Sequence, residues 1–441
     1  MNHKFGVMKR AKGILARLAL IGVGLMMALV AIEGGLHLIP SSYVDRIVER
    51  SSQRLQLYRL DPRIGWTPNP HAETVITTRD ERSIPITINS LGLRDSEHSY
   101  QKPPGVFRGL MLGDSFTEAL DVHLAESYPY QVEACLGQQL AQPVEIINGG
   151  VSGYNTADEY LFYHYEGVRY NPDLVLLLLY VGNDFAGLER DITKERLVAG
   201  FGGYRFSLED GQLKKVWVSW ETPADGQTSA AVLFLRNYSR LYRILAHPES
   251  KIYGWYRDTV TDWQQRLAPP SSDDDDDDET QSLPWHYYLH FKDFSNNPAS
   301  PPKLGEIWAI FLAIVRQLRG EVEANGGQLV VVIIPTNYQV SPAIRDKVVS
   351  RNPALNDEQV VAQWHLDEPN LTIVRELEGQ TIPVLDLLPY FEAHYEAGGA
   401  HLYFEGSVDE HLNRDGQKLA ADVICDWLIQ NNSVHLPRRI K

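Results

Sequence analysis

The chain has 441 residues, of which 44% are hydrophobic, so it can bury a large core. Its formal net charge is −16 at pH 7, which argues against nucleic acid as a partner because phosphate contacts need a basic face. Only two cysteines occur, Cys135 and Cys425, which excludes a cysteine-rich metal site and a framework of several disulfides.

The N-terminal segment combines positive charge with an apolar run. Five Lys or Arg side chains between Lys4 and Arg17 precede residues 18–32, which carry no charge. Counted from Gly13, the run reaches about 20 residues, the length that crosses a bilayer. Because basic residues favour the cytoplasmic side, we expect a single-pass anchor in the inner membrane, with a cytoplasmic N-terminus and a periplasmic body. A cleaved signal peptide is the alternative, although no convincing Ala-x-Ala site follows.

Changes of composition along the chain predict five segments. They are a tail and anchor at 1–40, a juxtamembrane and small β-rich portion at 41–105, the two parts of one α/β domain at 106–190 and 304–441, and an insertion at 191–303. Within the second segment, β-branched runs at 74–78 and 84–88 flank a polar turn, which is typical of a hairpin. Six consecutive aspartates lie in the stretch 268–283 of the insertion, and they predict a disordered, solvated loop.

Five apolar runs with little alternation predict the sheet of the α/β domain. They span 106–113, 143–148, 173–182, 328–335 and 381–387. Strands that read this way are covered on both faces, which is typical of a parallel sheet between helices. Helical patterns lie between them, one starting after Ser127 as its cap and one over residues 304–327. This order predicts an open, doubly wound α/β fold with the insertion between its third and fourth strands.

The two cysteines leave two interpretations open. Cys135 lies on the apolar stripe of the helix that follows Ser127, which favours a small buried thiol. A disulfide with Cys425 is the alternative in an oxidising compartment, but the sequence does not bring the two residues together.

Polar residues follow several predicted strands directly. The first strand runs into Gly113-Asp114-Ser115, the second into "NGGVSGYNT" at 148–156, and the third into "GND" at 182–184. In an open α/β sheet, reactive groups gather at the carboxyl ends of the strands. A serine becomes a nucleophile when an imidazole takes its proton, and His411, near the C-terminus, is a candidate for that base.

Four short motifs carry a resemblance to a known family. "GDSFT", "NGGVSG", "GND" and "DEHLN" resemble, in this order, the four blocks of the SGNH (GDSL-type) hydrolase superfamily. The surrounding "INSLGLRD", "GDSFTEALDV" and "YNPDLVLLLLYVGNDF" look like its membrane-anchored bacterial envelope branch. The resemblance covers about residues 85–190 and 304–430, and it implies a flavodoxin-like order of strands in the sheet.

The resemblance also implies roles for single residues. Ser115 matches the nucleophile, and its own N–H the first donor of the oxyanion hole. Gly153 matches the glycine donor, with Gly150 as the alternative if the loop register differs. Asn183 matches the side-chain amide donor, and His411 the general base. The residue after Asn183, an aspartate, is expected to cap the following turn.

The last motif departs from the family pattern. In many relatives the orienting aspartate stands three residues before the histidine, a position held here by Val408. Asp409, two residues before His411, is the nearest candidate and resembles the Asp-x-His form of some envelope acetyltransferases. Glu410 would point elsewhere, and Glu405 is a distant reserve.

Together these features predict an extracytoplasmic serine esterase that hydrolyses acyl esters, with acetyl as the expected acyl group. Acylated envelope glycans or lipids are the expected substrates, and we expect no metal and no cofactor, because the histidines show no ligand spacing. A polysaccharide O-acetyltransferase with the same acyl-enzyme is one alternative, since the aromatic-rich insertion could line a glycan groove. A non-catalytic glycan-binding or scaffold module is the other.

Overall fold

The structure is a computed structural model, and it describes most of the chain outside the predicted anchor and insertion. The described positions are 24, 27–29, 31–36, 57–61, 63–78, 82–185, 187, 188, 203–209, 212–218, 302–351, 365–404, 411–432 and 434–437. The chain divides into two compact units, residues 1–55 with 221–276 and residues 56–220 with 277–441. Most of the predicted anchor lies outside the described positions, and none of the helices within them has the length and apolar character needed to cross a bilayer.

The second unit begins with two antiparallel strand pairs. β1 (Tyr58–Asp61) pairs with β2 (Gly65–Pro68), and β3 (Glu73–Thr77) pairs with β4 (Ser83–Thr87). The second pair agrees with the predicted hairpin. Ile76 of β3 and the alternating Ile84 and Ile86 of β4 are buried, so this hairpin has one apolar face.

The centre of the unit is a parallel sheet of five strands in the order β11-β10-β7-β5-β6. Their bounds are Val384–Asp386, Gln328–Ile334, Leu174–Tyr180, Phe107–Gly113 and Val144–Gly150. Numbered along the chain, this order is 5-4-3-1-2, so the predicted doubly wound, flavodoxin-like sheet is confirmed.

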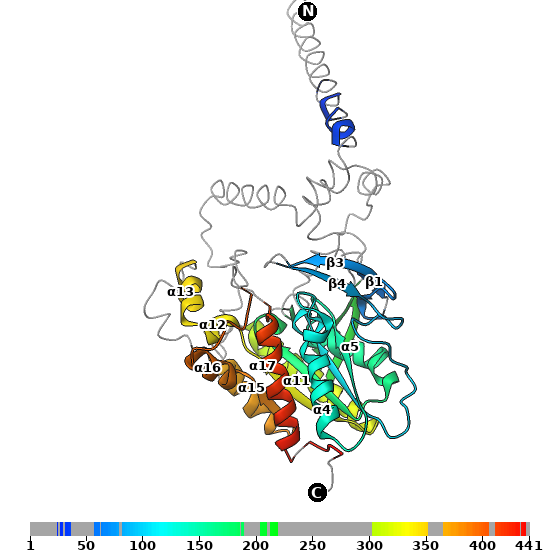
Figure 1. The fold of residues 1–441 in the computed structure, drawn as a ribbon, viewed down its shortest axis with the longest axis vertical. Helices are drawn as coiled ribbons and strands as arrows, with labels where there is room; N and C mark the ends of the chain where they lie inside the picture. Colours follow the sequence, from blue (N-terminus) through cyan, green and yellow to red (C-terminus); the bar gives the residue numbers. More distant parts are fainter. Residues whose placement is uncertain are drawn as a thin grey trace, which may run out of the picture. The chain divides into compact units, whose positions relative to one another are not determined.

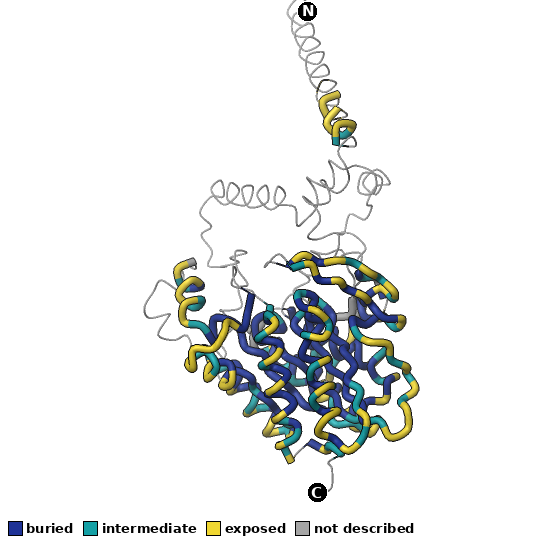
Figure 2. The backbone as a smooth tube through the Cα atoms, in the orientation of Figure 1, coloured by how far each residue is buried: buried dark blue, intermediate teal, exposed yellow. Residues whose placement is uncertain are grey.

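The strands are buried because each face of the sheet has its own apolar core. All seven residues of β7 are buried, and so are all seven of β5 (Figure 2). Along β7, Leu177 packs into one core and its neighbour Leu178 into the other. This is the physical reason that the apolar runs of the sequence lack alternation.

Helices cover both faces (Figure 1). One core contains residues of α5 (Thr156–Tyr165), α11 (Pro302–Ala324) and α15 (Glu368–Glu378). The other contains residues of α4 (Tyr128–Gln139), α16 (Leu388–Glu396) and α17 (Arg414–Gln430). Short helices α12 (Asn337–Val340) and α13 (Pro342–Arg351) follow β10.

Little of the predicted insertion is described. β8 (Gly203–Glu209) and β9 (Gln212–Val218) form an antiparallel pair, and Phe206 packs edge-on against Tyr160 of α5, with ring centroids 5.8 Å apart. The acidic stretch 268–283 lies outside the described residues.

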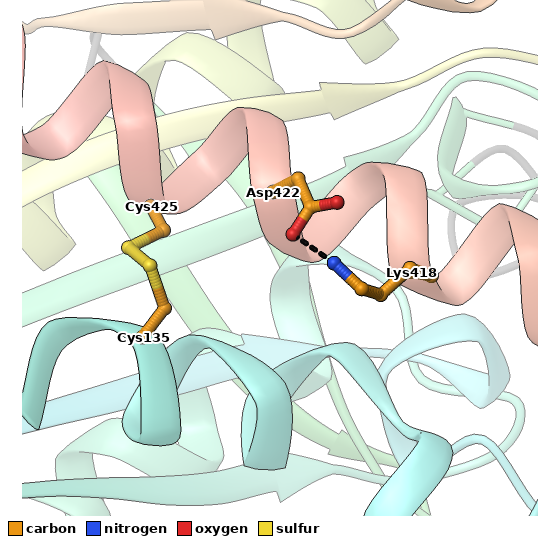
Figure 3. Close-up of a disulfide and its surroundings, with 4 residues drawn as sticks. All are labelled: Cys135, Lys418, Asp422 and Cys425. Carbon is orange, nitrogen blue, oxygen red and sulfur yellow. Dashed lines mark hydrogen bonds and ion pairs between the residues drawn. A yellow bond between two sulfur atoms is a disulfide. The ribbon is translucent and has the colours of Figure 1, made fainter. Parts of the chain in front are cut away.

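The two cysteines form a disulfide. α4 and α17 lie side by side on one face of the sheet, and this brings the Cα atoms of Cys135 and Cys425 to 6.4 Å (Figure 3). The interpretation of Cys135 as a free buried thiol is therefore wrong, and the alternative is correct. The same close-up shows Lys418 paired with Asp422 on the outside of α17.

One detail of the predicted helix starts is also different. Ser127 stands at the N-cap position of α4, but its hydroxyl donates to the carbonyl of Leu124 (2.7 Å) and accepts no N–H of the helix. The preceding turn, Leu124–Glu126, is a 3₁₀ helix, and both the N–H and the hydroxyl of Ser127 donate to its Leu124 carbonyl.

Candidate active site

Ser115 lies where β5 runs without a loop into the short helix α3 (Ser115–Glu118). The turn is so tight that a Cβ at Gly113 would come within 2.0 Å of the Thr117 hydroxyl. Asp114 caps the helix, since its carboxylate accepts the N–H of Phe116 (2.8 Å). The glycine and the cap together leave Ser115 half-buried at the carboxyl edge of the sheet.

His411 comes from the other end of the domain. Its segment is held against residues 402–404, because Phe404 N–H donates to the His411 carbonyl (3.1 Å) and Asn413 N–H to that of Leu402 (3.0 Å). Asn413 then caps α17. The histidine is therefore placed by a short paired turn and by the start of the last helix.

The two residues meet although 296 positions separate them. The Ser115 hydroxyl lies 2.8 Å from Nε2 of His411. On the other side of the ring, Nδ1 lies 2.9 Å from a carboxylate oxygen of Asp121. The edge of the ring packs against Phe116, with centroids 5.0 Å apart. A hydroxyl, an imidazole and a carboxylate thus stand in line, which is the arrangement that activates serine nucleophiles.

Asp121 is the residue that sequence reasoning missed. It follows Ser115 by six positions, in "GDSFTEALDV", whereas the carboxylate was sought beside the histidine. Asp409, like Glu405 and Glu410, lies outside the described residues, so its role stays a prediction. The sequence does show an aspartate in the turn after Ser115, but no rule of spacing connects a residue in that turn with a distant histidine.

The loop after β6 carries the two glycines considered as oxyanion donors. Gly150 N–H already donates to the Asn148 side chain (3.0 Å), and a Cβ at Gly150 would lie 2.5 Å from a backbone nitrogen. These contacts give Gly150 a packing role and argue against it as the donor. Gly153 sits in the exposed turn beyond it with φ +82°, a conformation that favours glycine. Trp66 of β2 lies against this turn, with its indole N–H donating to Ser152 O (3.1 Å).

Asn183 follows β7 and is oriented by Asp114. Its amide nitrogen donates to Asp114 Oδ2 (2.9 Å), and the other oxygen of Asp114 caps α3. An amide nitrogen carries two hydrogens, so the second is left to point elsewhere. Asp184 accepts the N–H of Tyr180 (2.8 Å), the last residue of β7, so this bond reaches back to the strand, and the predicted capping of the following turn stays a prediction.

Buried carboxyls surround Asp114. Burial, followed by repulsion from Asp184, raises the pKa of Glu159 well above its ordinary range. Burial and the charge of Asp114 do the same to the pKa of Asp184. The neutral acid is therefore favoured at both positions, which limits the negative charge beneath the site. Across the described positions, no group of His, Cys, Asp or Glu side chains is arranged to bind a metal ion.

Comparison with known proteins gives distant structural likenesses. No protein-family model and no curated protein matches the chain. Similar solved structures include AlAXEase, an acetyl xylan esterase, with TM-score 0.32 and 13% identity over 73% of this chain and 98% of that chain. Axe2, an acetylxylan esterase from Geobacillus stearothermophilus, gives 0.33 and 11% over 75% and 96%. A protein described under the G-D-S-L lipolytic family from Desulfitobacterium hafniense DCB-2 gives 0.31 and 11% over 72% and 98%. At these values the likenesses assign no family, and the functional argument rests on the site.

Proposed function

We propose that this chain is a serine esterase that forms an acyl-enzyme on Ser115. The observation that supports it most is the 2.8 Å contact between the Ser115 hydroxyl and Nε2 of His411. Both groups are half-buried, so an ester can reach a hydroxyl whose proton has an acceptor. A serine that only capped a helix would have no reason to meet a histidine from the last part of the domain.

The reaction proceeds in two halves. Ser115 Oγ attacks the ester carbonyl while His411 Nε2 takes its proton, and the same proton passes to the leaving alcohol as the C–O bond breaks. Water then attacks the acyl-serine with His411 again as base, which releases the acid and restores the hydroxyl. We propose Ser115 N–H, Gly153 N–H and the second amide hydrogen of Asn183 as donors to the oxyanion. Loss of one such donor costs about 2.7–4 kcal/mol in well-studied serine hydrolases.

We further propose that the enzyme works outside the cytoplasm, anchored by its N-terminal segment. The basic residues before the apolar run support this orientation, and so does the Cys135–Cys425 disulfide, because such bonds persist in oxidising compartments. An acylated glycan or lipid of the envelope is then within reach as substrate.

The test is labelling and turnover of the purified protein. A fluorophosphonate probe should modify Ser115, and p-nitrophenyl acetate should be hydrolysed. Ser115→Ala and His411→Ala should each lower kcat by about 10⁴-fold or more. The exposed Ser350→Ala serves as the matched control. Full turnover by Ser115→Ala would favour the binding-module alternative, and acyl transfer to an added glycan faster than hydrolysis would favour the transferase.

A further inference from the structure

We infer that Asp121 is the carboxylate that positions His411 for its reaction with Ser115. The inference rests on the proposed function and adds a residue to which neither the motifs nor the resemblance assigns a role. Its starting observation is the 2.9 Å distance between His411 Nδ1 and Asp121 Oδ2, on the side of the ring opposite Ser115.

The two contacts of the ring determine its tautomer. An ionised carboxylate only accepts hydrogen bonds, so Nδ1 carries the hydrogen that faces Asp121. Nε2 is then left with a lone pair that faces the serine hydroxyl, which is the form a general base requires. When the base takes the serine proton, the positive ring stands beside the negative carboxylate and is stabilised by it.

The turn that carries Asp121 is held from beneath by a buried guanidinium. Arg94 donates to the carbonyls of Glu118 (2.6 Å), Ala119 and Val122, which lie on both sides of Asp121. Burial lowers the pKa of Arg94 to about 10, so it remains a cation at neutral pH. Moving the turn would take these three carbonyl acceptors away from a buried charge, which is unfavourable.

The same turn is tied to the loop of the proposed oxyanion donor. The buried carboxylate of Glu118 accepts Ser152 N–H (2.7 Å) and the Tyr58 hydroxyl (2.6 Å). Ser152 directly precedes Gly153. One stretch of chain, residues 118–122, therefore positions the carboxylate on one side and contacts the donor loop on the other.

The exposure of the pair fits a positioning role. The Asp121 side chain is 17% exposed and that of His411 29%, so water screens this contact less than it screens a surface ion pair. The Phe116 ring packs against the imidazole at an interplanar angle of 75° and limits the directions that the imidazole can take. Among the residues that the structure describes, Asp121 supplies the carboxylate within hydrogen-bond distance of Nδ1.

The experiment compares two isosteric changes in the full chain, Asp121→Asn and Asp409→Asn. We expect Asp121→Asn to lower kcat by about 10³–10⁴-fold, as loss of an orienting aspartate does in other serine hydrolases, with little change in KM. The loss in Asp409→Asn should be at least tenfold smaller. Asp415→Asn, in the first turn of α17 with a side chain that is 47% exposed, is the matched control.

Two readouts separate positioning from a general structural effect. In Asp121→Asn the acidic limb of the pH profile of kcat/KM should move to lower pH, because the imidazolium loses a negative neighbour. The downfield ¹H NMR signal of the His411 Nδ1 hydrogen should disappear in Asp121→Asn and persist in Asp409→Asn. Thermal unfolding of both variants checks that the fold is intact.

The outcomes are distinct. A loss in Asp409→Asn equal to or larger than that in Asp121→Asn overturns the inference and leaves the esterase standing. Retention of the Nδ1 signal in Asp121→Asn also overturns it. Turnover that survives in Ser115→Ala and His411→Ala instead removes the proposed function itself.

Discussion

The two halves of the candidate site are built in different ways. Ser115 stands at the end of a central strand whose every residue is buried, and its position follows from the sheet. His411 stands on a half-exposed turn before α17, and its position follows from side-chain links to the other half. One link is the buried Gln417, which accepts Tyr128 N–H (2.8 Å) and donates to the carbonyl of Phe116 (3.3 Å). The comparison teaches that the serine is set by backbone geometry and the histidine by docking of a helix.

Among these changes, Gly113→Ala is expected to disturb the position of Ser115 most. The added Cβ would meet the hydroxyl of Thr117 at 2.0 Å, and Thr117 cannot withdraw easily because it is buried and bonded to Tyr128. We expect a loss of about 1–3 kcal/mol in the free energy of unfolding from overpacking. Displacement of Ser115 by an ångström should lower kcat about 10²-fold. Urea unfolding and ester turnover measure the two effects.

Gly137→Ala is the control for that change. A Cβ at Gly137 meets nothing within 4 Å, and the position lies inside α4, where alanine is favoured over glycine by about 1 kcal/mol. It should therefore raise stability and leave kcat unchanged. If the two variants had the same stability and kcat, the tight packing at the end of β5 would not be what holds Ser115 in place.

The histidine half is tested by removing its covalent link. The double change Cys135→Ser with Cys425→Ser should lower the free energy of unfolding by about 2–4 kcal/mol. Because the Gln417 contacts remain, kcat at temperatures well below unfolding should fall less than tenfold. Melting curves with and without reductant check this, and reductant should have no effect on the double variant. A loss of kcat as large as that of Gly113→Ala would mean that the disulfide, and not helix packing, sets the distance between Nε2 and the serine.

The smallest expected effect concerns pH and the buried pair His98–Asp95, which supports the serine half. Burial disfavours the charged ring, but the hydrogen bond and the charge of Asp95 prevail and raise the pKa of His98 above 6.5. Asp95 in turn accepts Asn148 N–H of β6 (2.7 Å). The charged His98 ring beside Asp95 therefore stabilises the fold fully below pH 6.5, and this contribution is lost as the pH rises through the raised pKa of His98.

His98→Gln should therefore cost more stability at pH 5.5 than at pH 8.5, as measured by the free energy of unfolding in urea. His435→Gln, at an exposed position, is the control and should show no such difference. A cost that is independent of pH would show that the ring contributes through packing alone.

The sequence predicts some of these features well for identifiable reasons. The strands β7 and β10 can be predicted from the sequence, because a strand that is buried on both faces needs an unbroken apolar run. Ser115 is predicted as the nucleophile because it follows a buried strand and lies in one of four ordered motifs, and the structure places its hydroxyl 2.8 Å from Nε2 of His411.

Other features depend on pairing across the chain, which no local pattern encodes. Cys135 reads as one more apolar residue on its stripe until α17 lies beside α4. In the sequence Asp121 looks like an ordinary turn residue, because its contact with His411 forms only when distant parts of the chain come together. The hydroxyl of Ser127 can accept an N–H of α4 or donate to the preceding turn, and in the structure it donates to the Leu124 carbonyl.

The strand order has a consequence for how the protein folds while it is being synthesised. The strand that bears Ser115 lies inside the sheet and is made early, whereas the helix after His411 is made hundreds of residues later. Chains fold from the end that emerges first, and contacts between distant positions close last. Under the proposed function, a growing chain therefore holds Ser115 without its proposed base, and it is expected to have no esterase activity until α17 docks. Because Cys135 and Cys425 lie on α4 and α17, formation of their disulfide would report that α17 has docked.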